Sequence, residues 1–79
     1  MSPTVFREGP YRFFFFSREE PRMHIHVGGP DGEAKFWIEP TIEIAESYGI
    51  PSRELTVIRE MVESHEQDIR AAWRRHFGR

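Results

Sequence analysis

Residues 21–29 read PRMHIHVGG, and the strand that they predict orders the rest of the sheet. Three apolar side chains alternate in this run with two histidines, His24 and His26. Because successive side chains of a strand point to opposite faces, a strand here buries the apolar residues and presents both imidazoles on one face. The residues predicted to be buried are Met23, Ile25 and Val27. On the other face, residues i and i+2 lie roughly 6–7 Å apart, close enough for two rings to share a ligand.

A hairpin is predicted before this strand. Residues 4–8 form a short strand, Gly9-Pro10 is a turn signal, and residues 11–16 form a second strand that ends in four consecutive phenylalanines. The phenylalanine run places rings on both faces of its strand, which is typical of a strand inside a sheet or covered on both sides.

A second hairpin is predicted after the histidine strand. Residues 28–32 carry dense turn signals, and residues 33–39 alternate again. One parity of this run, Ala34, Phe36 and Ile38, joins the apolar face. The other parity places Lys35 and Trp37 beside the histidines. Residues 41–46 predict a short edge strand, with a helical turn as the alternative.

The C-terminal third predicts one long helix. Ser52 is a suitable N-cap, and apolar residues then recur at three- and four-residue spacing from Leu55 to Phe77. Acidic residues precede basic ones along this segment, which complements the helix dipole, and Gly78 is a stop signal. The predicted fold is α+β, a curved antiparallel sheet of four or five strands packed on one long C-terminal helix, in a single domain of residues 1–79.

The composition excludes several classes of protein. The chain of 79 residues has no cysteine, so it has neither a disulfide nor a thiolate metal site. A net charge of −2 argues against binding driven by the phosphates of nucleic acid, which we do not favour as a partner. No apolar run has the length of a membrane span, and the first residues do not resemble a signal peptide, so we expect a cytoplasmic protein without a membrane partner.

One helix covers one face of the predicted sheet and leaves the histidine face uncovered. Large aromatic side chains on an uncovered face predict contact with a second copy, with another protein or with a ligand. The residues predicted to form this interface are Phe14, Phe16, Lys35 and Trp37.

The histidines also permit a chemical hypothesis. His24 and His26 are candidate acid–base residues, or candidate ligands of a divalent metal such as zinc. Two protein ligands seldom hold zinc tightly, and the candidate third ligands are His65, Glu33, Glu39 or a residue of a second copy. Against this, the alternation turns the strand pair away from the helix that carries His65, which favours His65 as a hydrogen-bonded residue at the edge of the core. We predict no cofactor, with the metal site as the alternative.

Several stretches resemble a small bacterial family catalogued as domain of unknown function 4160. They are HIHV at residues 24–27, GEAKFWIEP at residues 32–40, REL at residues 53–55, and an ending that contains His65-Glu66, Trp73 and His76-Phe77-Gly78. The resemblance implies a prokaryotic protein often encoded beside a second small domain of unknown function (number 2442), in a layout that looks like a toxin–antitoxin pair. It implies no known reaction.

The sequence therefore leads to one preferred function and one alternative. The first is a small protein-interaction module, one component of a toxin–antitoxin-like pair, whose partner is the second small protein encoded alongside or another copy of the chain in a homodimer. The alternative is a small ribonuclease or metal-dependent hydrolase that uses His24 and His26. An enzyme requires an open cleft around the imidazoles, whereas a binding module requires a flat face with an apolar centre.

Overall fold

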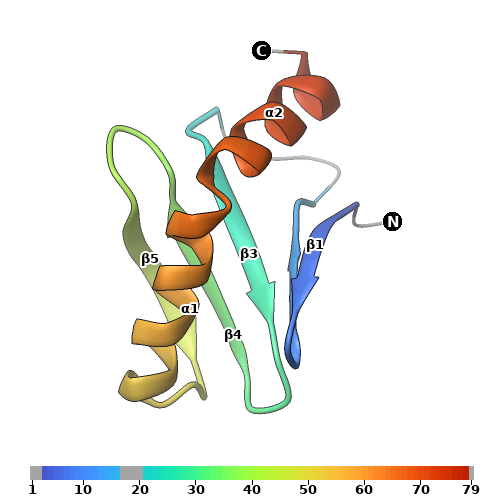
Figure 1. The fold of residues 1–79 in the computed structure, drawn as a ribbon. Helices are drawn as coiled ribbons and strands as arrows, with labels where there is room; N and C mark the ends of the chain where they lie inside the picture. The colour runs from blue at the N-terminus through green and yellow to red at the C-terminus, as the bar shows by residue number, and fades with distance from the viewer. Residues whose placement is uncertain (1–2, 17–20, 79) are drawn as a thin grey trace.

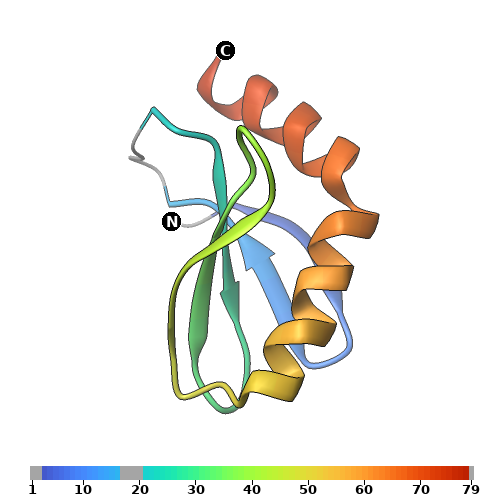
Figure 2. The same cartoon turned by 90° about the vertical axis from the view of Figure 1, so that its left-hand side faces the viewer.

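A five-stranded sheet and two helices make up the described part of the chain, residues 3–16 and 21–78 of a computed structural model. The strands are β1 (Thr4–Glu8), β2 (Tyr11–Phe14), β3 (His24–Gly28), β4 (Glu33–Trp37) and β5 (Glu43–Tyr48), and the helices are α1 (Ser52–Ser64) and α2 (Glu66–Phe77). The sheet is antiparallel throughout, and each strand pairs with its neighbour in the sequence. Both helices lie over one face of the sheet (Figures 1 and 2).

The predicted strands are confirmed, with small differences at their ends. β1 has the predicted bounds, and β2 ends two residues earlier than predicted. The edge strand predicted at residues 41–46 is β5, which begins and ends two residues later and lies at the edge of the sheet. The hairpin between β3 and β4 closes as predicted, where the Gly29 N–H donates to the Gly32 carbonyl at 3.0 Å. β2 lies between β1 and β3, which explains why its phenylalanines occupy both faces.

The core lies between the sheet and the helices, and the alternation of the strands predicts its membership correctly. Each of the three central strands contributes one parity of side chains, while the helices contribute a stripe at three- and four-residue spacing. The buried residues on the central strands or directly beside their ends are Tyr11, Phe13, Phe15, Met23, Ile25, Val27, Ala34, Phe36 and Ile38, and the buried helix residues are Ile58, Val62, Ile69, Ala72 and Trp73.

The prediction of one long helix is wrong, because the helical segment breaks at His65. The backbone of His65 has φ −107° and ψ 17°, outside the helical region, and α2 leaves the junction in a new direction (Figure 1). The His65 ring stacks on Phe6 of β1, with ring centroids 3.9 Å apart, and lies within 3.2 Å of Glu8 Oε1. The break thus coincides with contacts that hold the helix junction against the edge strand.

The start of α1 also differs from the prediction. Ser52 is the first helical residue and not the N-cap, a position that Pro51 occupies without a side-chain hydrogen bond. The Pro51 carbonyl accepts hydrogen bonds from the amides of Glu54 and Leu55, each at 3.0 Å. At the other end, Gly78 adopts φ +75° and terminates α2, as predicted. Neither described helix combines the length and apolar character that a membrane span needs.

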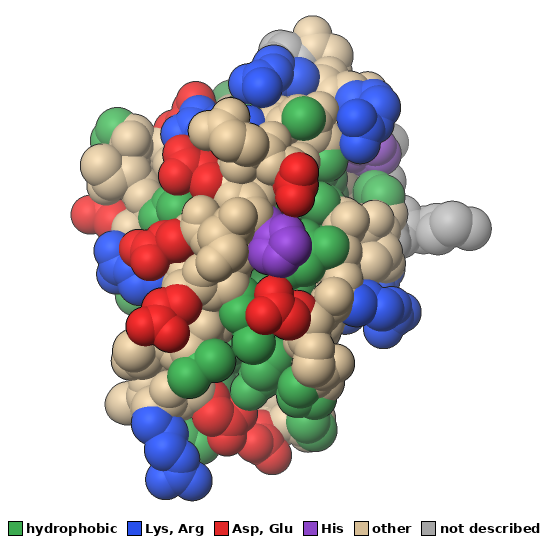
Figure 3. Space-filling model, in the orientation of Figure 1, with side chains coloured by type: hydrophobic (Ala, Val, Ile, Leu, Met, Phe, Trp, Pro, Cys, Tyr) green, Lys and Arg blue, Asp and Glu red, His purple; other side chains and the backbone are tan. Residues whose placement is uncertain are grey.

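The charges on the helices agree with this division into two elements. α2 carries Glu66 and Asp68 in its first turn, and Arg74, Arg75 and His76 in its last turn. Figure 3 shows basic side chains gathered over the end of α2 and acidic ones spread over the middle of the same side of the molecule. The arrangement complements the dipole of α2 taken alone.

Gly32 and Gly49 bring two loops into backbone contact at one end of the sheet. A Cβ atom on Gly32 would fall on the carbonyl oxygen of Tyr48, and one on Gly49, whose φ is +78°, would meet the carbonyl oxygen of Asp31. Only glycine leaves room for this approach. The contact joins the β3–β4 turn to the segment that leads from β5 into α1.

Candidate functional site

The face of the sheet opposite the helices is the candidate site. Within residues 3–16 and 21–78 no helix crosses it (Figure 2). We call it the open face, and we define it by the side chains that its register and contacts place there: Thr4, Arg7, Arg12, Phe14, Phe16, His26, Glu33, Lys35, Trp37, Glu43, Glu46 and Tyr48. It contains all four residues predicted as an interface, whose role stays a prediction.

The register arranges the open face in rows that run across the strands. One row is Arg7, Arg12, Gly28, Glu33 and Tyr48, and the next is Thr4, Phe14, His26, Lys35 and Glu46. A third row contains His24, Trp37 and Glu43. Directly paired residues share a face of the sheet, so these rows describe which side chains are neighbours on it.

His24 and His26 share a face, as their alternation predicts, and their ring centroids are 5.1 Å apart. His24 is nevertheless fully buried. Its ring packs edge-on against Trp37 at 5.6 Å and against Trp73 of α2 at 5.2 Å. Because His24 Nδ1 lies 2.6 Å from the carbonyl oxygen of Arg22, this nitrogen carries a hydrogen and donates it. The structure thus places His24 inside the packed part of the protein, and its catalytic role stays a prediction.

His26 occupies a more accessible position among aromatic rings. Its ring centroid lies 4.3 Å from that of Phe16 and 5.6 Å from that of Phe14. The three rings form one side of a pocket of about 130 Å³, and Lys35, Glu46 and Tyr48 contribute to the remainder. The pocket is small, of a size that suits a single side chain better than a cofactor.

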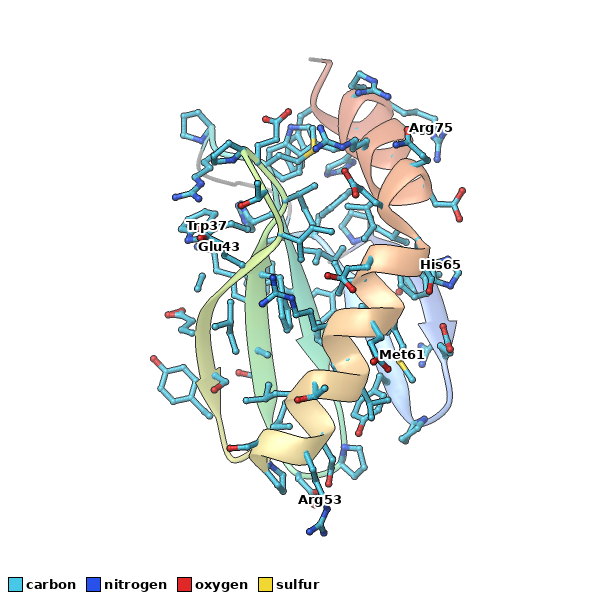
Figure 4. The ribbon with its side chains drawn as sticks, turned by 60° about the vertical axis from the view of Figure 1, so that its left-hand side comes forward. Trp37, Glu43, Arg53, Met61, His65 and Arg75 are labelled. Atoms are coloured by element: carbon cyan, nitrogen blue, oxygen red, sulfur yellow. The ribbon has the colours of Figure 1, made fainter. Side chains whose placement is uncertain are left out.

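Trp37 lies between two cations on the open face. The Arg22 guanidinium is 4.2 Å from the ring centroid, and the Lys35 ammonium is 4.4 Å from it. Arg22 also forms an ion pair with Glu43 at 3.6 Å and donates a hydrogen bond to the carbonyl of Glu39 at 2.8 Å. These contacts hold the indole in one orientation beside Glu43, on the side away from the helices (Figure 4).

His65 does not join the other two histidines. Its ring lies on the helix-covered side, between Glu8 and Asp68, with nitrogen–oxygen distances of 3.2 and 3.3 Å (Figure 4). No group of three or more histidine, aspartate or glutamate side chains in the described ranges is placed to hold a metal ion. The proposed zinc ligands His24, His26 and His65 are therefore not assembled, because the sheet separates His65 from the strand pair.

The sequence analysis missed the part of the open face that β5 contributes. Tyr48 has an exposed fraction of 66 %, and Glu46 and Glu43 share its face. It also missed Arg12, which stacks on Phe14 at 4.5 Å and donates a hydrogen bond to Thr4 Oγ1. The alternation of residues 43–48 carries the signal, but a bulge in the pairing of β4 with β5 shifts the parity, so the faces could be assigned only after the register was known.

The fold and this face define a small α+β protein with a meander sheet, and both helices in the described part of the chain lie on one side of it. The chain belongs to the family described as Domain of unknown function (DUF4160), which matches residues 11–74. The resemblance stated from the sequence is therefore confirmed. No curated protein and no solved structure matches the chain significantly.

Proposed function

We propose that this protein is a protein-interaction module and that the open face is its binding surface. One observation carries the proposal: Phe16 and Tyr48, with exposed fractions of 46 % and 66 %, border the same pocket on that face. Large aromatic side chains in this position resemble the anchors of protein interfaces, which contribute much of the binding free energy.

The surroundings of these anchors support the same function. The centre of the open face is aromatic, with Phe14, Phe16 and His26 in mutual contact, and its margins carry Arg7, Glu43 and other charged residues. An apolar centre with a polar margin is the usual composition of a protein–protein interface. Of the two features expected of a binding module, the apolar centre supports the proposal.

The position of the protein in a two-component system is part of the proposal. Membership of the family supports it through the paired genes that the resemblance implies, which is an association and not a physical argument. We propose that the chain is one component of a toxin–antitoxin-like pair.

The alternative function, a ribonuclease or hydrolase, has no comparable support. It requires His24 and His26 to act together on a substrate, and His24 is enclosed between two tryptophans. We therefore assign the histidine pair to the packing of the open face and give it no catalytic step.

Substitution of the two aromatic anchors tests the proposal. Phe16→Glu and Tyr48→Glu should weaken association by at least tenfold, both with another copy, measured by light scattering, and with the small protein encoded alongside, measured by calorimetry. Val57→Glu is the matched control, because Val57 has an exposed fraction of 45 % but lies on α1. All three variants should keep the wild-type circular dichroism spectrum. If both anchor variants associate as the wild type does in both assays, the open face is not the binding surface.

A further inference from the structure

We infer that the occupant of the open face is a second copy of this chain, docked face to face about a two-fold axis parallel to β3. The inference rests on the proposed function and names the partner for the same surface. It depends on how charge is distributed across the strands, and on which side chains the register places opposite one another.

Charge is divided between the two halves of the open face. The β1–β2 half carries Arg7 and Arg12, whereas Glu33, Glu43 and Glu46 lie on β4 and β5. Two cations also lie on the acidic half, Lys35 and Arg22, and both lie over the Trp37 ring. Taken together, the face is close to electrically neutral, which suits a partner with the same two halves better than it suits a polyanion.

A two-fold axis parallel to β3 brings opposite charges together. Rotation about this axis turns the face over and exchanges its halves, so β2 of one copy lies over β4 of the other, while β3 lies over β3. Arg12 and Glu33 belong to one row of the sheet, with Gly28 between them, so each Arg12 meets Glu33 of the second copy. In the next row Phe14 meets Lys35 of the second copy, a cation–π pair.

The other face-to-face arrangement is unfavourable. An axis across the strands places each strand over its own counterpart, so the acidic edge on β5 faces the acidic edge of the second copy. Like charges in contact at an interface cost free energy and suppress that geometry. Charge therefore selects the axis parallel to β3, in which both ion pairs form at once because a two-fold interface is self-complementary.

The size of the face predicts a weak dimer. Five strands with a spacing of about 4.8 Å, each about five residues long at roughly 3.4 Å per residue, cover on the order of 400 Å². Standard interfaces bury about 800 Å² on each partner, and smaller ones are usually transient. We expect an equilibrium between monomer and dimer that shifts with protein concentration.

Complementary charge reversal tests the arrangement. Arg12→Glu and Glu33→Arg should each weaken self-association of the full chain at least tenfold in sedimentation equilibrium, because each creates two like-charge contacts. An equimolar mixture of the two variants should recover the dimer, since the carboxylate introduced at position 12 of one chain then meets the guanidinium introduced at position 33 of the other. Arg53→Glu and Glu60→Arg are the matched controls, because both residues are exposed on α1, and their mixture should behave as the wild type does. Thermal melts report whether the variants fold.

Two outcomes overturn the inference. One is a wild-type chain that stays monomeric at millimolar concentration, and the other is a folded mixture that fails to recover the dimer. Binding of the small protein encoded alongside separates the inference from the proposed function. If the wild type is monomeric but Phe16→Glu abolishes that binding, only the second-copy inference fails. If neither association depends on the open face, both fail.

Discussion

The two histidines of β3 show how surroundings decide the role of a residue. His24 and His26 have the same parity, yet α2 reaches over the end of the sheet and encloses only His24, through Trp73. His24 thus joins two aromatic groups from different elements, whereas His26 remains part of the open face beside Phe16.

We expect His24→Ala to destabilise the protein by about 2–4 kcal/mol, because it removes a buried ring and leaves a cavity between Trp37 and Trp73. Urea unfolding followed by tryptophan fluorescence measures the effect. His76→Ala is the histidine control, since His76 is exposed on α2 and its loss should cost less than about 0.5 kcal/mol. Equal unfolding midpoints for the two variants would contradict the structural role of His24.

The environment of the Tyr11 hydroxyl leads us to expect that the stability of the protein depends on pH. Its hydroxyl donates a 2.8 Å hydrogen bond to Glu54, and this bond, together with burial, raises the pKa of the phenol above its ordinary value near 10. The folded state therefore holds this proton to a higher pH than the unfolded state does. The contribution to stability is complete below about pH 10 and is lost as pH rises through the folded pKa.

Tyr11→Phe should remove that dependence. We expect the variant to be less stable by about 1 kcal/mol at neutral pH, because it lacks the hydrogen bond. Between about pH 8 and pH 11 its urea midpoint should fall less than that of the wild type. Parallel pH profiles for the two proteins would show that Tyr11 does not couple folding to its ionisation.

At the scale of the element, the C-terminal helical segment consists of two helices, and the break between them lies at His65, where the segment contacts the edge strand β1. The stack of His65 on Phe6 and its contacts to Glu8 and Asp68 hold the junction on β1, and α2 then crosses the end of the sheet. Arg70 reinforces this placement through Glu66 at 2.9 Å and Glu39 at 3.0 Å, and these bonds raise the pKa of the Arg70 guanidinium. The acidic residues Glu66 and Asp68, which are typical of the first turn of a helix, were the sequence signal that a second helix begins there.

The stripe of α1 that faces the sheet should dominate the stability of the helix. Ile58→Ala should cost on the order of 2–4 kcal/mol, because Ile58 is fully buried in the core. Glu63→Ala should cost less than about 0.5 kcal/mol, since Glu63 is exposed and its ion pair with Arg59 lies in solvent. Denaturant melts of both variants provide the comparison, and a smaller loss for Ile58→Ala than for Glu63→Ala would contradict the assigned face.

For the whole molecule, the main consequence of the fold is a sheet with one covered and one open face. In residues 3–16 and 21–78 both helices lie on one side of the sheet, and the alternating strands leave aromatic and charged side chains on the other. Burial of that second face by association would add to the limited core that a chain of 79 residues can build.

Self-association on the open face should therefore be visible in thermal stability. The melting temperature of the wild type should rise by a few degrees over a hundredfold increase in protein concentration, because a partner that binds only the folded state stabilises it. The melting temperature of Arg12→Glu should stay constant over the same range of protein concentration. A wild-type melting temperature that is independent of concentration would argue against the dimer.

The faces of the central strands were predictable because side-chain alternation is a local property. The buried set Met23, Ile25 and Val27 and the opposite set with Lys35 and Trp37 follow from a period of two residues, whatever lies around the strand. Short sequence motifs likewise indicated the family to which the chain belongs. These features needed no knowledge of distant contacts.

The break at His65, the enclosure of His24 and the rows of the open face could not be predicted, because each depends on residues far apart in the sequence. The enclosure of His24 by Trp73 of α2 accompanies the contact of the helix junction with Phe6, and Arg12 shares a row with Glu33 only through the pairing of three strands. Alternation shows which way a side chain points from its own strand. What that side chain meets is set by the packing of other elements around it.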